Sequence, residues 1–324
     1  MKKYNVFIVA GPLHVMNAIE AISYFNTKNN ILLILYTANS DQLNQMEKLL
    51  GFAKWHSVKY IPLPEKKLDK IFFVQKVYMS LKGIEKKSLE KVFVGEYRSD
   101  HVNHIVNFFQ SKEVYLLDDG LAQLSYHEEI ATQSLKVRVR RLIYMALLYK
   151  LKRINYTFFS MFEIENEKCI KNNYLFFKQY IEKKETEDIV YFIGQPLVEL
   201  NIISELDYRE MIAKVMEFYV TKRFVYIMHR REKEKNIEKL SEALNFKYLK
   251  LSNLIELEMI NAKVVPSDFS TFFSTAIVTL PKFIENSEYR VFELENRYLN
   301  KEYISEVTQT YSELKKMDLQ VERL

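Results

Sequence analysis

The chain has 324 residues, 48% hydrophobic and 27% charged, so it is long enough for two domains with cores and too apolar to be disordered. No stretch approaches the roughly 18 uninterrupted apolar residues of a membrane-spanning helix, and the single Cys169 excludes an internal disulfide or a cysteine zinc site. The net charge of +5 is too small to indicate a nucleic-acid partner, and no recognition motif for RNA or DNA accompanies it.

The first part of the chain alternates short apolar runs with helical segments. Runs of strand length occur at residues 4–10, 31–36, 58–63, 91–94 and 114–117, and helical spacing follows at 15–25. The first run is too short for a signal peptide, so we expect a cytoplasmic protein. Continuous apolar strands separated by helices are typical of a parallel, doubly wound sheet.

A second group of strands follows a long interruption. Residues 128–187 look mostly helical, and the charge-rich end of this stretch at 182–188 could be a linker. Further strand-length runs lie at 189–193, 223–228, 246–251, 262–265 and 289–294, with a helix predicted at 232–244. We therefore predict two Rossmann-like domains, residues 1–185 and 186–324, with ligands beyond the carboxyl ends of the strands.

Residues 136–153, "KVRVRRLIYMALLYKLKR", place basic residues on both sides of an apolar helical centre. Such a helix could lie in the plane of an anionic membrane surface. Alternatively, it could be a buried helix whose basic ends are solvated.

Two adjacent carboxylates and a glycine follow the fifth strand in "VYLLDDGLAQL". Neighbouring carboxylates in a partly desolvated site raise each other's proton affinity, so Asp118 and Asp119 could include a general base. They could also form a solvated turn or hold a divalent metal. Gly11, Gly95, Gly120 and Gly194 all stand near the end of a predicted strand, where the chain must turn or let a ligand approach the backbone.

The second group of strands carries three further candidates. His229, which ends a strand and precedes Arg230, could donate to a phosphate or protonate a leaving group, or cap the next helix. Gly194, Gln195 and Pro196 form a turn that could meet a nucleobase. Hydroxyl residues lead into a short apolar helix, where they could form an anion site or act as N-caps: Ser267, Ser270, Thr271, Ser274 and Thr275.

Two histidines, His101 and His104, have the i, i+3 spacing of a shared metal site, but no third ligand is evident in the sequence. We therefore expect them on a solvated helix face.

Taken together, these motifs resemble a bacterial sialyltransferase of glycosyltransferase family 52, the lipooligosaccharide and capsule type. The resemblance covers most of the chain and rests on the order and spacing of weak elements: "GPLHVMNAIE", "VGEYRS" at 94–99, the acidic pair with Gly120, "IGQPLVE" at 193–199, His229, the glutamate in "NLIELEM" and the hydroxyls at 274–275. It implies an α/β protein of the GT-B fold, in which two Rossmann-like domains face a central cleft.

The resemblance also implies roles for single residues. Asp118 would be the general base that deprotonates the acceptor hydroxyl, with Asp119 as its support and the fallback choice. His229 would contact the nucleotide phosphate and assist the departure of CMP. Arg230 stands where the family has proline, so the orientation of His229 is less fixed by the backbone, and Arg230 could add a phosphate contact.

The remaining roles concern the donor. The resemblance implies that Ser274 and Thr275, where the family often has two serines, hold the phosphate, and that Glu256 accepts hydrogen bonds from the ribose. Gly194 and Gln195 would lie near the cytidine, and Pro196 and Ser270 complete the predicted donor-binding set.

The implied reaction moves sialic acid from CMP-sialic acid to a hydroxyl of a galactose-type acceptor on a bacterial surface glycan, with inversion and without a metal or cofactor. The acceptor would be lipid-linked, at the inner face of the cytoplasmic membrane, and a homodimer is compatible with the sequence. Alternatives are a GT-B transferase that uses CMP-Kdo or a UDP-sugar, and a noncatalytic membrane-associated protein of polysaccharide assembly.

Overall fold

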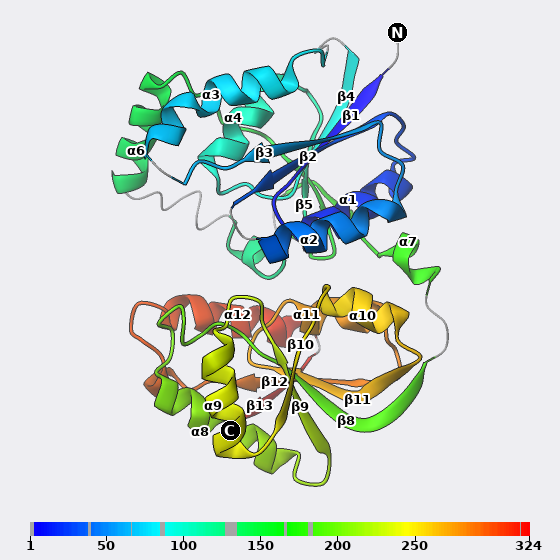
Figure 1. Ribbon diagram of the computed structural model, residues 1–324, viewed down its shortest axis with the longest axis vertical. Coiled ribbons are helices and arrows are strands. Elements are labelled where there is room, and N and C mark those ends of the chain that lie inside the picture. The colour runs from blue at the N-terminus through cyan, green and yellow to red at the C-terminus, as the bar shows by residue number, and fades with distance from the viewer. Residues whose placement is uncertain are drawn as a thin grey trace. The chain divides into compact units, whose positions relative to one another are not determined.

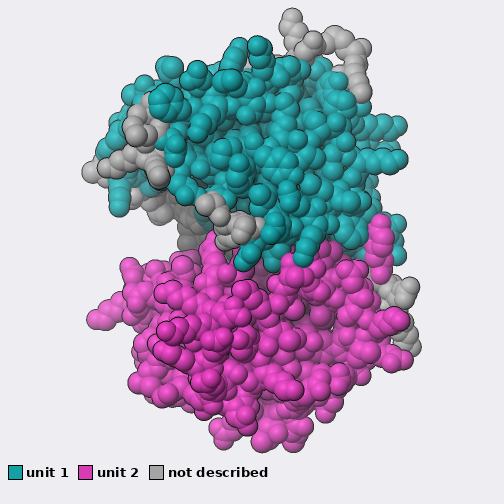
Figure 2. Space-filling view, in the orientation of Figure 1, with its two compact units in different colours: residues 1–179 teal, residues 180–324 magenta. Residues whose placement is uncertain are grey.

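The computed structural model describes residues 3–37, 40–65, 67–84, 88–126, 135–164, 167–180, 184–317 and 319–324. The chain forms two compact units, Met1–Gln179 (unit 1) and Tyr180–Leu324 (unit 2), coloured separately in Figure 2. The boundary predicted after residue 185 falls inside a strand that begins at Glu185. Glu185, Glu187 and Asp188 are charged and exposed, which explains the linker-like composition, but they belong to that strand.

Unit 1 contains a seven-stranded parallel sheet, and most of its strands are connected by helices (Figure 1). Its strands are β1 Tyr4–Val9, β2 Asn30–Tyr36, β3 Ser57–Pro62, β4 Leu89–Val94, β5 Val114–Leu117, β6 Thr157–Ser160 and β7 Cys169–Lys171. They are arranged in the order β3-β2-β1-β4-β5-β6-β7, so the direction of winding reverses between β1 and β4. Ligands of doubly wound sheets bind outside the carboxyl ends of the strands at such a reversal.

The helices of unit 1 begin at recognisable signals. Pro12 occupies the first turn of α1, where its missing N–H costs nothing, and the Ser99 hydroxyl caps α4 by accepting from the Val102 N–H at 3.4 Å. The described helices are α1 Pro12–Tyr24, α2 Ser40–Leu49, α3 Lys67–Leu81, α4 Asp100–Phe109, α6 Leu135–Ala146 and α7 Leu175–Lys178, with short 3-10 turns η1 Leu50–Phe52 and η3 Ala122–Ser125.

Unit 2 contains a six-stranded parallel sheet of the same winding. Its strands are β8 Glu185–Ile193, β9 Arg223–Met228, β10 Lys247–Lys250, β11 Val264–Thr271, β12 Glu288–Glu293 and β13 Gln320–Arg323, in the order β10-β9-β8-β11-β12-β13. The reversal therefore falls between β8 and β11. Its helices are α8 Glu205–Phe218, α9 Glu234–Leu244, α10 Ile255–Asn261, α11 Ala276–Thr279 and α12 Ile304–Lys316, with η4 Leu280–Lys282 and η5 Asn296–Tyr298.

The two parallel sheets confirm the predicted pair of Rossmann-like domains. All ten predicted strands overlap strands of the structure, although the run predicted at 262–265 is only the start of β11. The prediction that residues 128–187 are mostly helical was wrong for the described part of this segment, because β6 and β7 lie between α6 and α7, and residues 128–134, 165–166 and 181–183 lie outside the described residues. These strands have four and three residues, which is too short for a periodic signal. Among the described helices, none has the length and apolar character needed to cross a membrane.

Candidate active site

The carboxyl ends of three neighbouring strands in unit 1 lie at the same level. Val94 of β4 pairs with Ile8 of β1 on one side and with Leu116 of β5 on the other. The residues that follow these strands are therefore close together. They include His14 in the first turn of α1, Glu96 and Arg98 after β4, and Asp118 and Asp119 after β5.

His14 and Asp119 form a hydrogen-bonded pair in this cluster. The Ala10 backbone N–H donates to Nδ1 of His14 at 3.2 Å. Nδ1 therefore carries a lone pair, and in the neutral ring the proton is on Nε2, which lies 2.8 Å from Oδ1 of Asp119. His14 is buried, and its hydrogen bond with the Ala10 N–H fixes the orientation of the ring. The imidazole therefore donates from Nε2 to Asp119.

Asp119 also remains accessible. Its Oδ2 accepts from Nη1 of Arg98 at 3.2 Å, and 27% of its side chain is exposed. Each carboxylate oxygen can accept more than one hydrogen bond. Asp119 can therefore keep its contacts with His14 and Arg98 while accepting a further donor from solvent or a ligand.

Asp118 lies in a different environment from its neighbour. Its side chain is fully buried, Oδ1 accepts from the Ser160 hydroxyl, and Oδ2 accepts from the Met161 N–H at 2.9 Å. Burial raises the pKa of Asp118 to about 7, although both hydrogen bonds oppose the shift. The side chain thus joins the end of β5 to the end of β6 and offers no exposed oxygen.

Glu96, which is half-buried, also belongs to this cluster. Burial raises the pKa of its carboxyl group, the nearby His14 opposes this effect, and the charge of Asp119 adds to it. His14, Glu96 and Arg98 were not among the residues predicted for the site. They lie within the motifs "GPLHV" and "VGEYRS", and their position directly after buried strands was the signal that could have identified them.

Two glycines are required by the geometry of this cluster. A Cβ on Gly95 would lie 2.3 Å from the ring of His14, so only glycine lets the imidazole pack against the end of β4. Gly120 has φ of 70°, in the left-handed region that other residues rarely adopt. The glycine after the acidic pair thus serves the turn itself.

Unit 2 brings a second set of residues to the carboxyl edge of its sheet. Ile193 of β8 pairs with Ile227 of β9, and Phe192 pairs with Ser270 of β11. The segments that follow these strands are therefore neighbours. They contain Gly194 to Pro196, His229 and Arg230, and Ser274 and Thr275.

His229 is held in one orientation by its own loop. Nδ1 accepts from the Arg231 N–H at 3.1 Å, so in the neutral ring Nε2 carries the proton. Burial, together with Arg230 and Arg231, lowers the pKa of His229 to about 4. At neutral pH His229 is therefore an uncharged donor. Burial also lowers the pKa of Arg230, whose desolvated guanidinium would gain from an anion.

A buried series of hydrogen bonds connects Tyr226 of β9 to His229 through the Glu232 carboxyl group. The Tyr226 hydroxyl lies 2.6 Å from the Tyr208 hydroxyl and donates to Oε1 of Glu232 at 2.6 Å, while Oε2 accepts from the His229 N–H at 2.6 Å. Burial raises the pKa of Glu232 to about 8. A Cβ on Gly194 would lie 2.4 Å from the same Tyr226 hydroxyl, so this tyrosine also explains the glycine.

Gln195 and Pro196 are buried in the turn after β8. The amide oxygen of Gln195 accepts from the Thr271 hydroxyl at 3.2 Å and from the Phe273 N–H at 2.9 Å. The side chain thus connects this turn to the segment after β11, and its oxygen is engaged within the protein.

The predicted hydroxyl-rich helix start is different in the structure. Ser267, Ser270 and Thr271 belong to β11, and Ser270 is fully buried there. Both faces of a parallel sheet are covered, so most residues of β11 are buried even where they are polar, and Ser267 is half-buried. Ser274 and Thr275 do precede α11 and are half-buried, but α11 has only four residues.

Glu256 lies at the start of α10 and is also buried. Its Oε1 accepts from the Thr279 hydroxyl, and burial raises the pKa of the carboxyl group. This contact joins α10 to α11, and the residue predicted to meet a ribose has little exposed surface.

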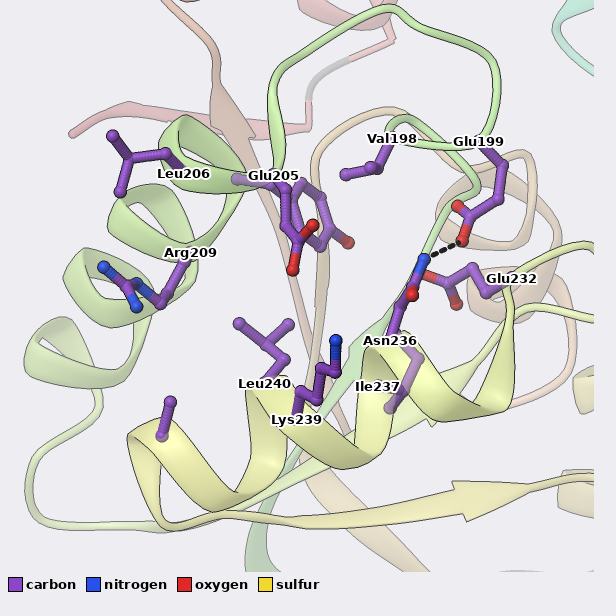
Figure 3. Close-up of a pocket in the computed structure, with 12 residues that line it drawn as sticks. Val198, Glu199, Glu205, Leu206, Arg209, Glu232, Asn236, Ile237, Lys239 and Leu240 are labelled. Atoms are coloured by element: carbon purple, nitrogen blue, oxygen red, sulfur yellow. Dashed lines mark hydrogen bonds between the residues drawn. The ribbon is translucent and has the colours of Figure 1, made fainter.

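A cavity of about 420 Å³ lies between α8 and α9 of unit 2 (Figure 3). Its lining includes Glu199, whose Oε1 accepts from Nδ2 of Asn236 at 3.1 Å, and also Arg209, Glu232 and Lys239. None of the site residues predicted from the sequence lines it. Through Glu232 it adjoins the chain of hydrogen bonds that ends at His229.

No group of three or more His, Cys, Asp or Glu side chains among the described residues is placed to hold a metal ion. The expectation that His101 and His104 lie on a solvated face was wrong for His104, which is buried and accepts from the Lys150 N–H at 2.8 Å. Burial lowers the pKa of both histidines to about 4.

Comparison with solved structures shows that the chain has the GT-B fold. A protein assigned as a UDP-N-acetylglucosamine 2-epimerase from Listeria monocytogenes has a TM-score of 0.56 at 13% identity, covering 98% of this chain and 90% of that one. The UDP-GlcNAc 2-epimerase from Methanocaldococcus jannaschii has a TM-score of 0.50 at 13% identity, with coverages of 96% and 92%. At these identities the similarity shows the fold alone.

The sequence comparison is more specific. No curated protein matches the chain. A family model, however, matches residues 60–295, a span that begins in β3 and ends beyond β12. It therefore includes the acidic pair, His229 and the hydroxyls that precede α11. The chain belongs to glycosyltransferase family 52.

Proposed function

We propose that this glycosyltransferase moves sialic acid from CMP-sialic acid to a hydroxyl of a galactose-terminated glycan. The observation that carries the proposal is the family match over residues 60–295. The two clusters of polar side chains support it, because glycosyl transfer needs a base for the attacking hydroxyl and help for the departing phosphate.

The acceptor is activated by Asp119 in this proposal. A general base must come within hydrogen-bonding distance of the proton that it takes. Asp119 is accessible, whereas Asp118 is fully buried with both oxygens engaged. The geometry therefore favours Asp119 as the general base, although the family resemblance makes Asp118 the first choice. His14 and Arg98 orient Asp119, and Asp118 holds the segment in place.

The donor is held by residues of unit 2. His229 donates from Nε2 to the phosphate of CMP, and the negative charge of the phosphate raises the proton affinity of the imidazole as the leaving group departs. Arg230 and the hydroxyls of Ser274 and Thr275 supply further contacts to the same phosphate. Since α11 is short, these hydroxyls matter more than the helix dipole.

The reaction is a direct displacement. The acceptor oxygen forms a bond with the anomeric carbon of sialic acid, the bond from that carbon to the phosphate oxygen breaks, and the acceptor proton passes to Asp119. A β-linked donor then gives an α-linked product. We propose that no metal takes part and that the acceptor is carried on a lipid at the inner face of the cytoplasmic membrane.

The test is incubation of the protein with CMP-sialic acid and a panel of galactosides, with CMP release and product mass as readouts. We expect CMP release that depends on the acceptor, a product heavier by one sialic acid, and an α-linkage by NMR. The absence of both CMP release and product across the panel would contradict the proposal.

Parallel incubations with CMP-Kdo and UDP-sugars test the choice of donor. Turnover of one of these donors, with none of CMP-sialic acid, would leave a glycosyltransferase but overturn the proposed substrate. Turnover of none, together with full biological function of Asp119→Asn and His229→Ala variants, would indicate a noncatalytic protein.

A further inference from the structure

Helix α6 is attached to unit 1 by one of its faces. Nη2 of Arg140 lies 2.9 Å and Nε of Arg141 lies 3.4 Å from the carboxylate of Asp100, which is buried at the start of α4. Tyr144, on the same side, stacks on Tyr149 with ring centroids 4.8 Å apart. Two of the basic residues in the predicted amphipathic segment therefore serve an internal contact.

The opposite face of α6 is apolar and exposed. Val139, Leu142 and Ile143 have the i, i+3, i+4 spacing of one helical face, and 62% of Leu142 is exposed. Leu148 in the following turn is 77% exposed. A helix on the surface of a globular protein normally turns its apolar stripe toward the core. This helix presents the stripe outward, which marks an interaction surface.

Exposed basic residues flank this stripe. At 100° per residue, Lys136 and Arg138 fall on opposite sides of it, and both are exposed. Lys150, Lys152 and Arg153 are exposed beyond the helix. Residues 135–153 contain no Asp or Glu. Within this segment the exposed face is therefore apolar at its centre, and every charged residue beside it is basic.

Helix α3 lies against α6 and the turn that follows it. Figure 1 shows α6 beside α3, and the Tyr149 hydroxyl donates to the Lys70 carbonyl at 3.1 Å. Nζ of Lys70 lies 5.8 Å from the ring centroid of Tyr144. These contacts fix α6 and the turn after it against α3.

We propose that Lys136, Arg138, Val139, Leu142, Ile143 and Leu148, here named the α6 surface, bind the protein to an anionic lipid bilayer. The apolar side chains enter the boundary between headgroups and acyl chains while the cations meet lipid phosphates. A second copy of the chain fits less well, because a two-fold contact would bring equal positive edges together. The inference rests on the membrane location proposed above, and its test needs no sugar donor.

The test is sedimentation of the full chain with phosphatidylcholine vesicles, with and without phosphatidylglycerol. We expect binding that needs the anionic lipid and weakens with salt. Replacing Leu142 and Ile143 by Gln should lower the partition coefficient roughly tenfold or more, and replacing Lys136 and Arg138 by Gln should lower it by about the same factor. Leu206→Gln, at a similarly exposed leucine of α8, is the control and should bind normally.

Turnover of a soluble galactoside tests the proposed reaction separately from membrane binding. The α6 variants should retain full turnover of this acceptor, because it is not attached to a lipid. Unchanged vesicle binding of both double variants would overturn the inference. So would equal binding to neutral and anionic vesicles, or a dimer in solution that the Leu142 and Ile143 changes dissociate while no vesicle binding is seen.

Discussion

Asp118 and Asp119 are adjacent in the sequence but differ in accessibility, and this difference predicts separate effects of the same substitution. Asp119→Asn removes the proposed base and should lower kcat by about 10²- to 10⁴-fold with little change in the far-UV spectrum or in CMP affinity. Asp118→Asn should lower kcat less, because its side chain contacts Ser160 and Met161 rather than a substrate. Steady-state kinetics of both variants make the measurement, and a larger loss in the Asp118 variant would reverse the assignment.

The buried Asp118 also predicts a dependence of stability on pH. Its pKa is about 7 in the folded protein, against 3.8 as its ordinary value. The folded state therefore holds this proton more tightly than the unfolded state. The resulting stabilisation is complete below about pH 4 and is lost as the pH rises to about 7, by at most ~4 kcal/mol.

Urea unfolding of the wild type and of Asp118→Asn across this range provides the check. Because other buried carboxyl groups also titrate, the difference between the two proteins is the quantity to compare. The fall in unfolding free energy should be smaller in the variant, and equal falls would show that Asp118 does not bind the proton.

Gly95 should not tolerate a side chain. The added Cβ of Gly95→Ala would displace the His14 ring from the end of β4, and with it the hydrogen bond to Asp119. We expect a loss of about 1–3 kcal/mol in stability and a larger relative loss in kcat. Gly51→Ala, where nothing lies within 4 Å of the added atom, is the matched control and should be close to neutral. Equal behaviour of the two variants would show that His14 need not pack against Gly95.

The loop between β9 and α9 is the element that orients His229. Glu232→Ala removes both carboxyl oxygens, so the His229 N–H loses its acceptor and the Tyr226 hydroxyl keeps only its contact with Tyr208. We expect weaker CMP binding and a roughly tenfold lower kcat, because the donor nitrogen of His229 moves. Calorimetry with CMP and steady-state kinetics separate these effects.

The control for this change lies one turn away. Glu234→Ala removes an exposed carboxylate that pairs with Lys250 at 3.0 Å, so it should leave CMP binding and turnover unchanged. Unaltered CMP affinity in the Glu232 variant would mean that the buried series of hydrogen bonds does not position His229.

Periodicity predicted the long strands and helices of the chain but not its short or mixed ones. β6 and β7 have too few residues for a pattern, and β11 contains Pro266, Ser267 and Asp268, which do not read as a strand. Pairing with β8 and β12 determines that β11 continues to Thr271. The hydroxyls of Ser267 and Ser270 were therefore assigned to a helix start that begins later.

At the scale of the whole molecule, the two units should respond differently to the nucleotide. Since the proposed phosphate contacts all lie in unit 2, CMP alone should slow amide hydrogen exchange near residues 194–196, 229–232 and 274–275. Unit 1 should exchange as in the free protein. Hydrogen exchange followed by mass spectrometry makes the comparison, and protection centred on the cluster around Asp119 instead would contradict the division of roles.

The sequence by itself determined the two doubly wound domains, because buried parallel strands must be continuously apolar and must be separated by helices. The place of the acidic pair, His229 and Arg230 after predicted strands made them candidates for the site, and their roles stay predictions. Only the tertiary structure decided which carboxylate is accessible. His14, Glu96 and Arg98 reach Asp119 through strand order, from positions up to 105 residues away along the chain. Burial and such long-range contacts depend on the packing of the whole unit, and local sequence does not encode them.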